Sequence, residues 1–248
     1  MPVPPPPMPP SPEAGTDRRP WIKICANTSV EDALLGVELG ADALGFVFAP
    51  SPRQVTAPQV HAISAQLPEA VERVGVFTSA SAAEVARTVE QAGLHTVQMH
   101  GPRSDAQWEE LAHALPPGTR MLPVVHFSLG EDAQGEARRV ARTLDELAAL
   151  RPGARILVDA KSGNASGGLG VAFDWHAAAP VFQPPQNHAR RNLRLILAGG
   201  LNPGNVLSAL ATLHPWGIDV ASGVESSPGK KDPRRLRLFI EAARSHSS

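Results

Sequence analysis

Residues 193–210, LRLILAGGLNPGNVLSAL, contain the unit that decides the fold. The apolar run at 193–198 predicts a buried strand, and the two glycines that follow it predict a turn. Asn202-Pro203 then predicts the start of a helix, because proline suits a first helical turn. The apolar residues between 206 and 210 have helical spacing. The segment therefore predicts one strand–loop–helix unit.

The same unit recurs along the chain. Apolar runs predict seven further strands, at residues 21–25, 43–48, 71–77, 95–99, 121–125, 155–159 and 218–221. Helical spacing follows them at residues 30–37 (after Ser29 as N-cap), 60–67, 82–89, 108–115, 144–148 and 232–240. Alternating units predict an α/β protein with a parallel sheet, and eight of them match a single-domain (β/α)8 TIM barrel. The alternative is an open doubly wound sheet, but no Gly-x-Gly-x-x-Gly follows the first strand.

Residues 1–20, MPVPPPPMPPSPEAGTDRRP, contain nine of the 25 prolines. Such a segment has few backbone amides to donate and little apolar area to bury, so we expect a disordered leader. It lacks the apolar region of a secretory signal, and a proline-rich ligand for an SH3-like groove is the functional alternative. We expect a leader over 1–20, a barrel domain over 21–244 and a flexible tail over 245–248.

The amino-acid composition argues against several classes of binding partner and site. The 23 basic and 24 acidic residues give a formal net charge of -1. The chain therefore has no excess of positive charge that would predict binding to nucleic acid or to an anionic membrane. No apolar run reaches the roughly 18 residues of a membrane span. The single cysteine excludes an internal disulfide framework and a multi-cysteine metal site, and it fits a reducing cytoplasm. We interpret the basic run at 230–237 as a solvent-exposed face of the last helix.

Polar side chains gather at the predicted strand ends. Side chains alternate along a strand, so Lys23 and Cys25 point into the barrel if Ile22 and Ile24 face the helices. Asp159 ends a later strand on its inner face, and His100 and Asp219 lie near the ends of two others. Each has a structural interpretation: a lone cysteine is usually a small buried hydrophobe, and Lys23 could simply neutralise a buried carboxylate. Their convergence at one end of the barrel favours a polar pocket.

Glycines give a second signal. Gly199 and Gly200 follow the seventh predicted strand, and Ser222 and Gly223 follow the eighth. In barrels these two loops often present backbone amides to a phosphate, although ordinary turns would also use glycine. Residues 163–170, with four glycines, predict a mobile loop that orders over a substrate.

Ten segments, taken in order, resemble the phosphoribosylanthranilate isomerase family of tryptophan biosynthesis. They are KIC at 23–25, GFVF at 45–48, SPR at 51–53, VQMHG at 97–101, LVD at 157–159, GGLG at 167–170, FDW at 173–175, LAGGLNP at 197–203, DVASGVE at 219–225 and PGKKD at 228–232. The resemblance runs from about residue 21 to residue 244. It implies a (β/α)8 barrel that performs an Amadori rearrangement of a phosphosugar without a metal or organic cofactor.

The resemblance also implies roles for individual residues. Cys25 corresponds to the family's general base and Asp159 to its general acid. Arg53 resembles the residue that pairs with the anthranilate carboxylate, and Asp219 a position near the anthranilate end. His100 lines the rim, with no defined step.

Further roles follow when the strand and loop pattern is combined with the family resemblance. Lys23 is expected to favour the thiolate of Cys25 through its charge. Gly199, Gly200, Ser222 and Gly223 would bind the phosphate, with help from Gly168. The expected partner is a small phosphosugar, and the chain is a monomer or a homodimer.

The chain departs from the family pattern at three places. Ala26 stands where the family usually has glycine, Leu169 stands where it has threonine, and residues 181–192 resemble a polar insertion. Two alternatives remain at this point. The aminoaldose isomerase of histidine biosynthesis would need an aspartate on the first strand, where this chain has Cys25. A non-enzymatic barrel would not need both Cys25 and Asp159.

Overall fold

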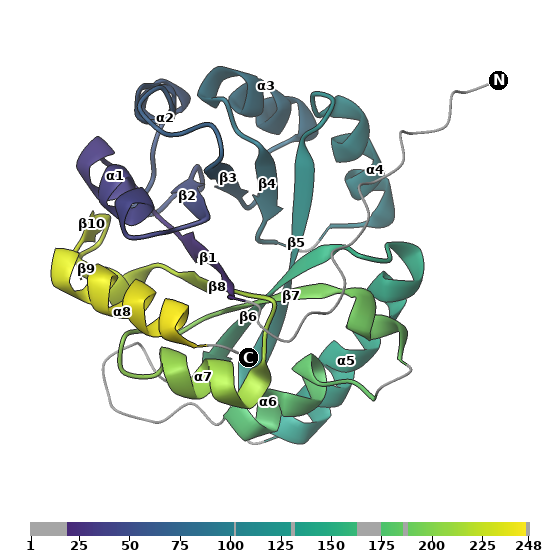
Figure 1. Ribbon diagram of the computed structural model, residues 1–248. Helices are drawn as coiled ribbons and strands as arrows, with labels where there is room; N and C mark the ends of the chain where they lie inside the picture. Colours follow the sequence, from purple (N-terminus) through teal and green to yellow (C-terminus); the bar gives the residue numbers. More distant parts are fainter. Residues whose placement is uncertain (1–18, 102, 130–131, 163–174, 186–187, 247–248) are drawn as a thin grey trace.

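The structure, a computed structural model, describes residues 19–101, 103–129, 132–162, 175–185 and 188–246. Eight parallel strands close into a barrel in chain order, which confirms the predicted fold and excludes the open sheet (Figure 1). The strands are β1 (Trp21–Ile24), β2 (Ala43–Val47), β3 (Glu72–Phe77), β4 (Thr96–Met99), β5 (Arg120–Leu129), β6 (Arg155–Ser162), β7 (Arg194–Ala198) and β8 (Gly217–Val220). Closure is made by β1 and β8, which pair from Trp21 opposite Gly217 to Ile24 opposite Val220.

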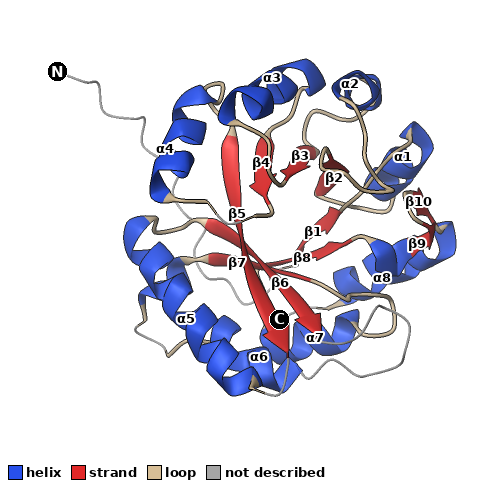
Figure 2. Ribbon diagram, turned by 180° about the vertical axis from the view of Figure 1, so that it is seen from behind, coloured by secondary structure: helices blue, strands red, loops and turns tan. Residues whose placement is uncertain are grey.

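Helices surround the barrel (Figure 2). They are α1 (Val30–Glu38), α2 (Ala57–Ser64), α3 (Ala82–Ala92), α4 (Asp105–Ala114), α5 (Ala133–Leu150), α6 (Trp175–Phe182), α7 (Val206–Leu213) and α8 (Pro233–Ser245), with 3-10 turns η1 (Ala189–Asn192) and η2 (Ser222–Val224). A short hairpin, β9 (Glu225–Ser227) and β10 (Lys230–Lys231), precedes α8. Within the described ranges, no helix is long and apolar enough to cross a membrane.

Local capping explains where the helices begin. The Ser29 side chain accepts a hydrogen bond from the amide of Asp32, as the predicted N-cap of α1 should. Asp232 caps α8, whose first residue is Pro233. The prediction for α7 was wrong by one turn, because Asn202 caps a preceding turn by accepting from the amide of Gly204. The helix itself begins at Val206.

Two strands are longer than the apolar runs predicted. β5 continues to Leu129 and β6 to Ser162, and the two stay paired over six residues. The additional residues of both strands include polar ones, and a strand predicted from an apolar run alone therefore ends too early. This extension places His126 directly opposite Asp159 in the sheet register.

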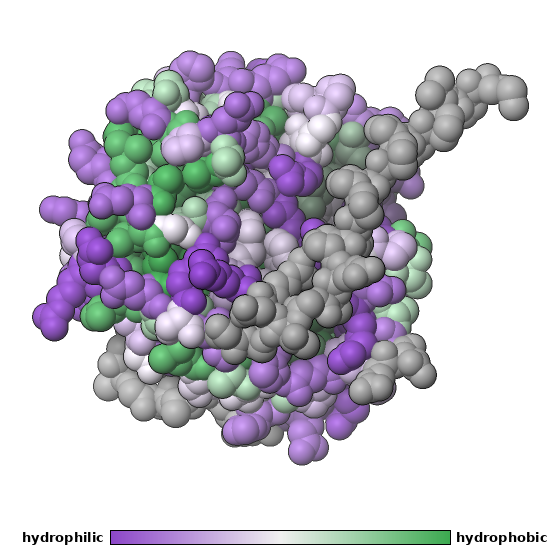
Figure 3. Space-filling model, viewed as in Figure 1, coloured by the Kyte–Doolittle hydropathy of each residue, from purple (hydrophilic) through white to green (hydrophobic). Residues whose placement is uncertain are grey.

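The apolar residues form two layers. Alternate strand residues such as Ile22, Ile24 and Val158 pack outward against the helices. A smaller inner cluster contains Leu122, Leu157, Ile196 and Ala198, with Trp21 and Trp216 packed against it. Alternation along β1 and β6 was therefore predicted correctly. On the face shown in Figure 3, hydrophilic residues are spread over the outer helices, and hydrophobic residues show mainly around α1 and α2.

The N-terminal end of the barrel is closed by a structural network. Trp21 and Trp216 stack with ring centroids 5.5 Å apart, and the Arg155 guanidinium lies over the Trp21 ring. Arg155 also donates hydrogen bonds to both carboxylate oxygens of Glu72, which accepts a third from Thr96. This closed end leaves the opposite end, where the strands terminate, for chemistry.

Candidate active site

Cys25 directly follows β1 and is almost fully buried, at 7% exposure. Its amide donates to the carbonyl of Val220, which holds it at the C-terminal end of the barrel. Burial raises the pKa of the Cys25 thiol, because a buried thiolate loses its hydration. The charge of Lys23 and its hydrogen bond to the sulfur act in the opposite direction, but burial outweighs them. Lys23 therefore offsets part of the effect of burial on the pKa of this thiol.

Lys23 and Asp219 form a buried ion pair beside this thiol. The two residues lie opposite each other on β1 and β8, and the Lys23 Nζ is 2.9 Å from Asp219 Oδ1. Burial alone would lower the pKa of Lys23, but the charges of Asp219 and Cys25 raise it above its ordinary value. The structure thus brings together two predicted site residues as partners of each other.

Arg53 is held by Glu225, a residue to which the sequence interpretation assigned no role. The Nε and Nη2 of Arg53 donate to the two oxygens of Glu225 at 2.9 and 2.6 Å. Burial would raise the pKa of Glu225, but the hydrogen bonds from Arg53 and the charge of Lys231 keep it low. The hydrogen bonds fix one edge of the guanidinium, and 26% of the Arg53 side chain is exposed.

Lys231 corrects the interpretation of the basic run. Its side chain is fully buried rather than exposed, and it belongs to the hairpin rather than to α8. The Lys231 Nζ donates to the backbone carbonyl of Cys25 at 2.5 Å and lies 3.4 Å from Glu225. The hairpin was part of the PGKKD and DVASGVE segments, but only the fold shows that it returns to the end of β1. Lys231 therefore fixes the backbone of the candidate base.

Asp159, in the C-terminal half of β6, lies between two histidines. His100 Nε2 and His126 Nδ1 are each 3.3 Å from Asp159 Oδ2, and the two rings meet edge to face with centroids 5.0 Å apart. His100 was expected at this rim, whereas His126 was missed because β5 was predicted to end before it. Had β5 been predicted to its true end, the pairing of β5 with β6 would have placed His126 opposite Asp159.

The glycine loops after β7 and β8 are closely packed. A Cβ on Gly199 would collide with the carbonyl of Ala160, and one on Gly223 would collide with the carbonyl of Leu201. Gly199 and Gly200 also have positive φ angles, of 94° and 64°. Among the described residues, the amides of Gly200 and Gly223 donate no backbone or side-chain hydrogen bond. Two amides in these loops thus lack an acceptor among the described residues, while Gly168, Leu169 and the rest of 163–170 lie outside the described residues.

Ala26 adopts a left-handed backbone conformation, with φ of 63°. Glycine adopts this region without penalty, and a Cβ makes it costly. The turn is held by Asn27, whose side chain donates to the carbonyl of Ile24 at 2.7 Å. Alanine in place of the family's usual glycine therefore leaves the backbone strained at residue 26.

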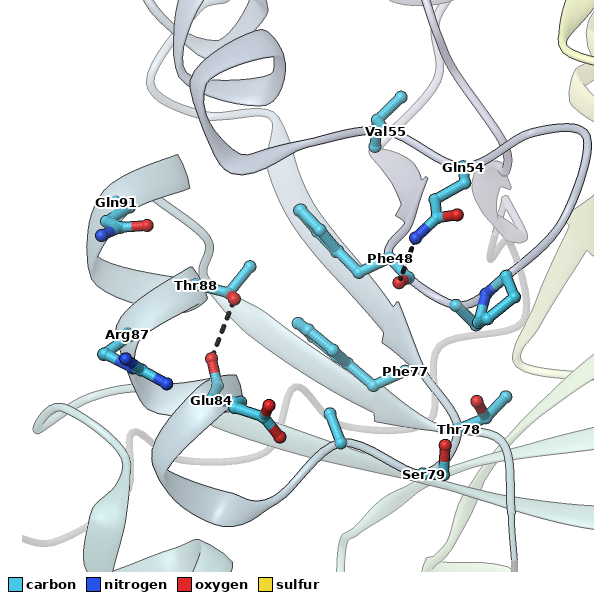
Figure 4. Close-up of a pocket in the computed structure, with 13 residues that line it drawn as sticks. Phe48, Gln54, Val55, Phe77, Thr78, Ser79, Glu84, Arg87, Thr88 and Gln91 are labelled. Atoms are coloured by element: carbon cyan, nitrogen blue, oxygen red, sulfur yellow. Dashed lines mark hydrogen bonds between the residues drawn. The ribbon is translucent and has the colours of Figure 1, made fainter.

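A cavity at this end of the barrel lies to one side of these residues. It has a volume of about 620 Å³ and opens between the ends of β2 and β3 and helix α3. The parallel rings of Phe48 and Phe77 form one wall, with Glu84 and Arg87 on the other (Figure 4). Neither Cys25 nor Asp159 lines it. A second cavity of about 580 Å³ lies at the opposite end, around Glu72 and Trp21.

Together, a closed parallel barrel and a group of buried polar side chains at its C-terminal end define a (β/α)8-barrel enzyme. Residues 22–242 match the family model for N-(5'phosphoribosyl)anthranilate (PRA) isomerase. The chain belongs to this family.

Relatives with the same family name cover nearly the whole chain. The N-(5'-phosphoribosyl)anthranilate isomerase of Pelobacter propionicus is 38% identical over 90% of this chain and 95% of its own length. The crystal structure of phosphoribosyl anthranilate isomerase from Thermotoga maritima has a TM-score of 0.74 and 34% identity, covering 92% of this chain and all of its own. Another crystal structure of such an isomerase, with a TM-score of 0.71 and 32% identity over the same share of both chains, contains reduced 1-(o-carboxyphenylamino)-1-deoxyribulose 5-phosphate.

Proposed function

We propose that this enzyme converts N-(5-phosphoribosyl)anthranilate to 1-(2-carboxyphenylamino)-1-deoxyribulose 5-phosphate, the third step of the tryptophan branch from chorismate. The observation that carries the proposal is a buried thiol and a buried carboxyl at one end of a barrel of this family. A relative that binds the reduced form of this product supports the choice of substrate. Cys25 and Asp159 are the proposed base and acid.

The reaction needs an acid first. The carboxyl of Asp159 donates its proton to the furanose ring oxygen, and the bond from that oxygen to C1' breaks. The anthranilate nitrogen supplies its lone pair to C1', which gives an open-chain protonated imine. The positive nitrogen then serves as the electron sink for the next step, so the substrate itself supplies the electrophile.

The base acts on the imine. The Cys25 thiolate removes the proton from C2', and the C–H electron pair forms the C1'–C2' double bond while the imine nitrogen becomes neutral. The resulting enolamine tautomerises to the ketone by gaining a proton at C1' and losing one from the C2' hydroxyl. Lys23, which favours the thiolate, and Lys231, which holds the Cys25 carbonyl, prepare this base.

Substrate contacts follow from the groups around this pair. Arg53 has a second guanidinium edge, which suits the anthranilate carboxylate because a planar guanidinium grips a carboxylate at two points. The amides of Gly200 and Gly223, which lack an acceptor among the described residues, suit the phosphate. Gly199 and Ser222 shape these loops, and we assign Gly168, His100, Lys23 and Asp219 to the same pocket.

The finer properties belong to the same proposal. The partner is the phosphosugar, the working compartment is the cytoplasm, and neither nucleic acid nor a membrane takes part. A structure of monomers generated from a dimeric isomerase of Thermotoga maritima shows both forms among relatives, so we propose a monomer or homodimer here. Residues 1–20 and 245–248 are proposed as a leader and a tail outside the barrel domain.

The test is turnover of freshly generated phosphoribosylanthranilate, followed by the loss of anthranilate fluorescence. Wild type should turn over, and Cys25→Ala and Asp159→Asn should each reduce kcat/KM by about 10²- to 10⁴-fold, the range for a lost acid or base. Asp105→Asn, on the exposed start of α4, is the matched control. Activity retained in both site variants, or a wild type that turns over only the aminoaldose of histidine biosynthesis, would refute the assignment.

A further inference from the structure

His100, which directly follows β4, forms a three-residue cluster with His126 and Asp159, which lie in the C-terminal halves of β5 and β6. Each offers one ligand atom, and these atoms lie within 4.8 Å of one another. The family reaction as proposed uses only Asp159 of the three in a chemical step. The histidine pair thus has no chemical role assigned to it.

Two of the three ligand separations match those around a tetrahedral metal ion, and the third, between the histidine nitrogens, is at most 4.8 Å. Zinc binds imidazole nitrogen and carboxylate oxygen at about 2.0–2.2 Å, so two ligands of a tetrahedral site lie about 3.3–3.5 Å apart. Both imidazole nitrogens are 3.3 Å from Asp159 Oδ2. Two imidazoles and one carboxylate also form the ligand set of catalytic zinc sites, which leave the fourth position open.

Burial and access agree with this interpretation. The Nδ1 of His126 is buried and, within the described part of the chain, makes no hydrogen bond, although it lies 3.3 Å from Asp159 Oδ2. A bound cation would satisfy this atom. The side chains of His100 and His126 are 30% and 40% exposed, so an ion has a path from solvent, while the Asp159 side chain is 9% exposed.

We propose that His100, His126 and Asp159 bind one divalent transition-metal ion of the zinc class, and that this ion inhibits the enzyme reversibly. Inhibition follows because the ion takes the carboxylate oxygen that must otherwise carry the proton for ring opening. The inhibitory part rests on the proposed function, whereas the binding site rests only on the cluster. Metal and proton then compete for the same carboxylate.

Binding is tested first, without turnover. Chelator-treated protein is titrated with Zn²⁺ by calorimetry at mildly alkaline pH, because protons compete with metal ions for imidazole ligands. One ion per chain is expected. His126→Ala should weaken binding by about 100-fold or more, whereas His113→Ala, on the exposed face of α4, should leave it unchanged.

Co²⁺ provides a spectroscopic signature. A site with these ligands should give the intense visible absorption of tetrahedral cobalt in wild type and not in His126→Ala. No stoichiometric binding in wild type, or equal binding by wild type and His126→Ala, would overturn the site. A circular dichroism spectrum like that of wild type shows that the variant is folded.

Inhibition is then measured with the same ion. Zn²⁺ should reduce wild-type kcat/KM in proportion to the occupancy found by calorimetry, and chelator should restore it. Full occupancy without loss of turnover would overturn the inhibitory role. Stoichiometric binding by a wild type that lacks isomerase activity would instead refute the proposed function and leave the metal site standing.

Discussion

Gly45 on β2 lies against the thiol of Cys25 so closely that a Cβ on the glycine would stand 2.7 Å from the sulfur. The same Cβ would lie 3.0 Å from the Cε of Lys23. Only a hydrogen atom leaves room there for both side chains. The missing side chain of Gly45 on β2 therefore makes room for the thiol of Cys25 at the end of β1.

Gly45→Ala should displace the thiol and its lysine. Overpacking of a closed interior costs about 1–3 kcal/mol of unfolding free energy, and we expect kcat/KM to fall by about tenfold or more. Urea denaturation and the fluorescence assay measure the two effects. Gly36→Ala in α1 is the control, because its Cβ would make only ordinary contacts, with the side chains of Leu44 at 3.4 Å and Ile24 at 3.9 Å, and alanine favours a helix. Unchanged activity in Gly45→Ala would show that the thiol tolerates the shift.

The pH dependence of catalysis should report on Cys25. Because burial raises the pKa of its thiol, the thiolate is scarce at neutral pH, and kcat/KM should rise as pH increases toward that raised value. Lys23→Met removes a charge that lowers this pKa, so the profile should move to higher pH.

Lys23→Met also leaves Asp219 buried without its partner, which costs about 3–5 kcal/mol. The double variant Lys23→Met with Asp219→Asn removes both charges and is the control for stability. A pH–rate profile that stays in place in the folded variants would mean that Lys23 does not tune the thiol.

Ala26→Gly should relieve the strained turn after Cys25. A Cβ in the left-handed region costs about 1–2 kcal/mol, and glycine returns about 0.5–1 kcal/mol of this through the greater freedom of its unfolded chain. We expect a net gain of about 1 kcal/mol or less in unfolding free energy, measured by urea denaturation. Ala43→Gly, inside β2, is the comparison and should destabilise the protein. A destabilised Ala26→Gly variant would show that packing of the buried methyl group outweighs the strain.

Glu72→Gln should weaken the protein in a pH-dependent way. Burial alone would raise the pKa of Glu72, but the hydrogen bonds and charge of Arg155 hold it below its ordinary value of 4.5. A carboxyl with a lowered pKa stabilises the fold above the unfolded value, and this contribution is lost as pH falls through the folded value. The stability difference between wild type and variant should therefore be full near neutral pH and shrink below 4.5. A constant difference across this range would exclude the linkage.

The barrel could be predicted from the sequence because its signal is periodic. Alternation along β1 placed Lys23 and Cys25 on the inner face, and the same logic placed Asp159 correctly. The ends of β5 and β6 could not be found, because polar residues continue these strands beyond the apolar runs. His126 was lost with the end of β5.

Long-range pairs in the candidate site were also beyond the sequence. Arg53 and Glu225 are far apart along the chain, and only barrel closure shows that they share a double hydrogen bond. Lys231 looked like one of several surface cations, because the burial of one lysine in a basic run does not change the periodic pattern of the sequence. Its partner is a backbone carbonyl, which every residue has. The identities of such partners depend on topology rather than on local pattern.

The hairpin that carries Lys231 has a consequence for biosynthesis of the enzyme. A ribosome makes Cys25 among the first residues of the barrel and makes Asp219 and Lys231 among the last. Until those two emerge, Lys23 lacks its counter-ion and the Cys25 carbonyl lacks its donor. A nascent or prematurely terminated chain therefore contains the candidate base without the residues that fix Lys23 and the Cys25 backbone in place, so the site is assembled only when translation is nearly finished.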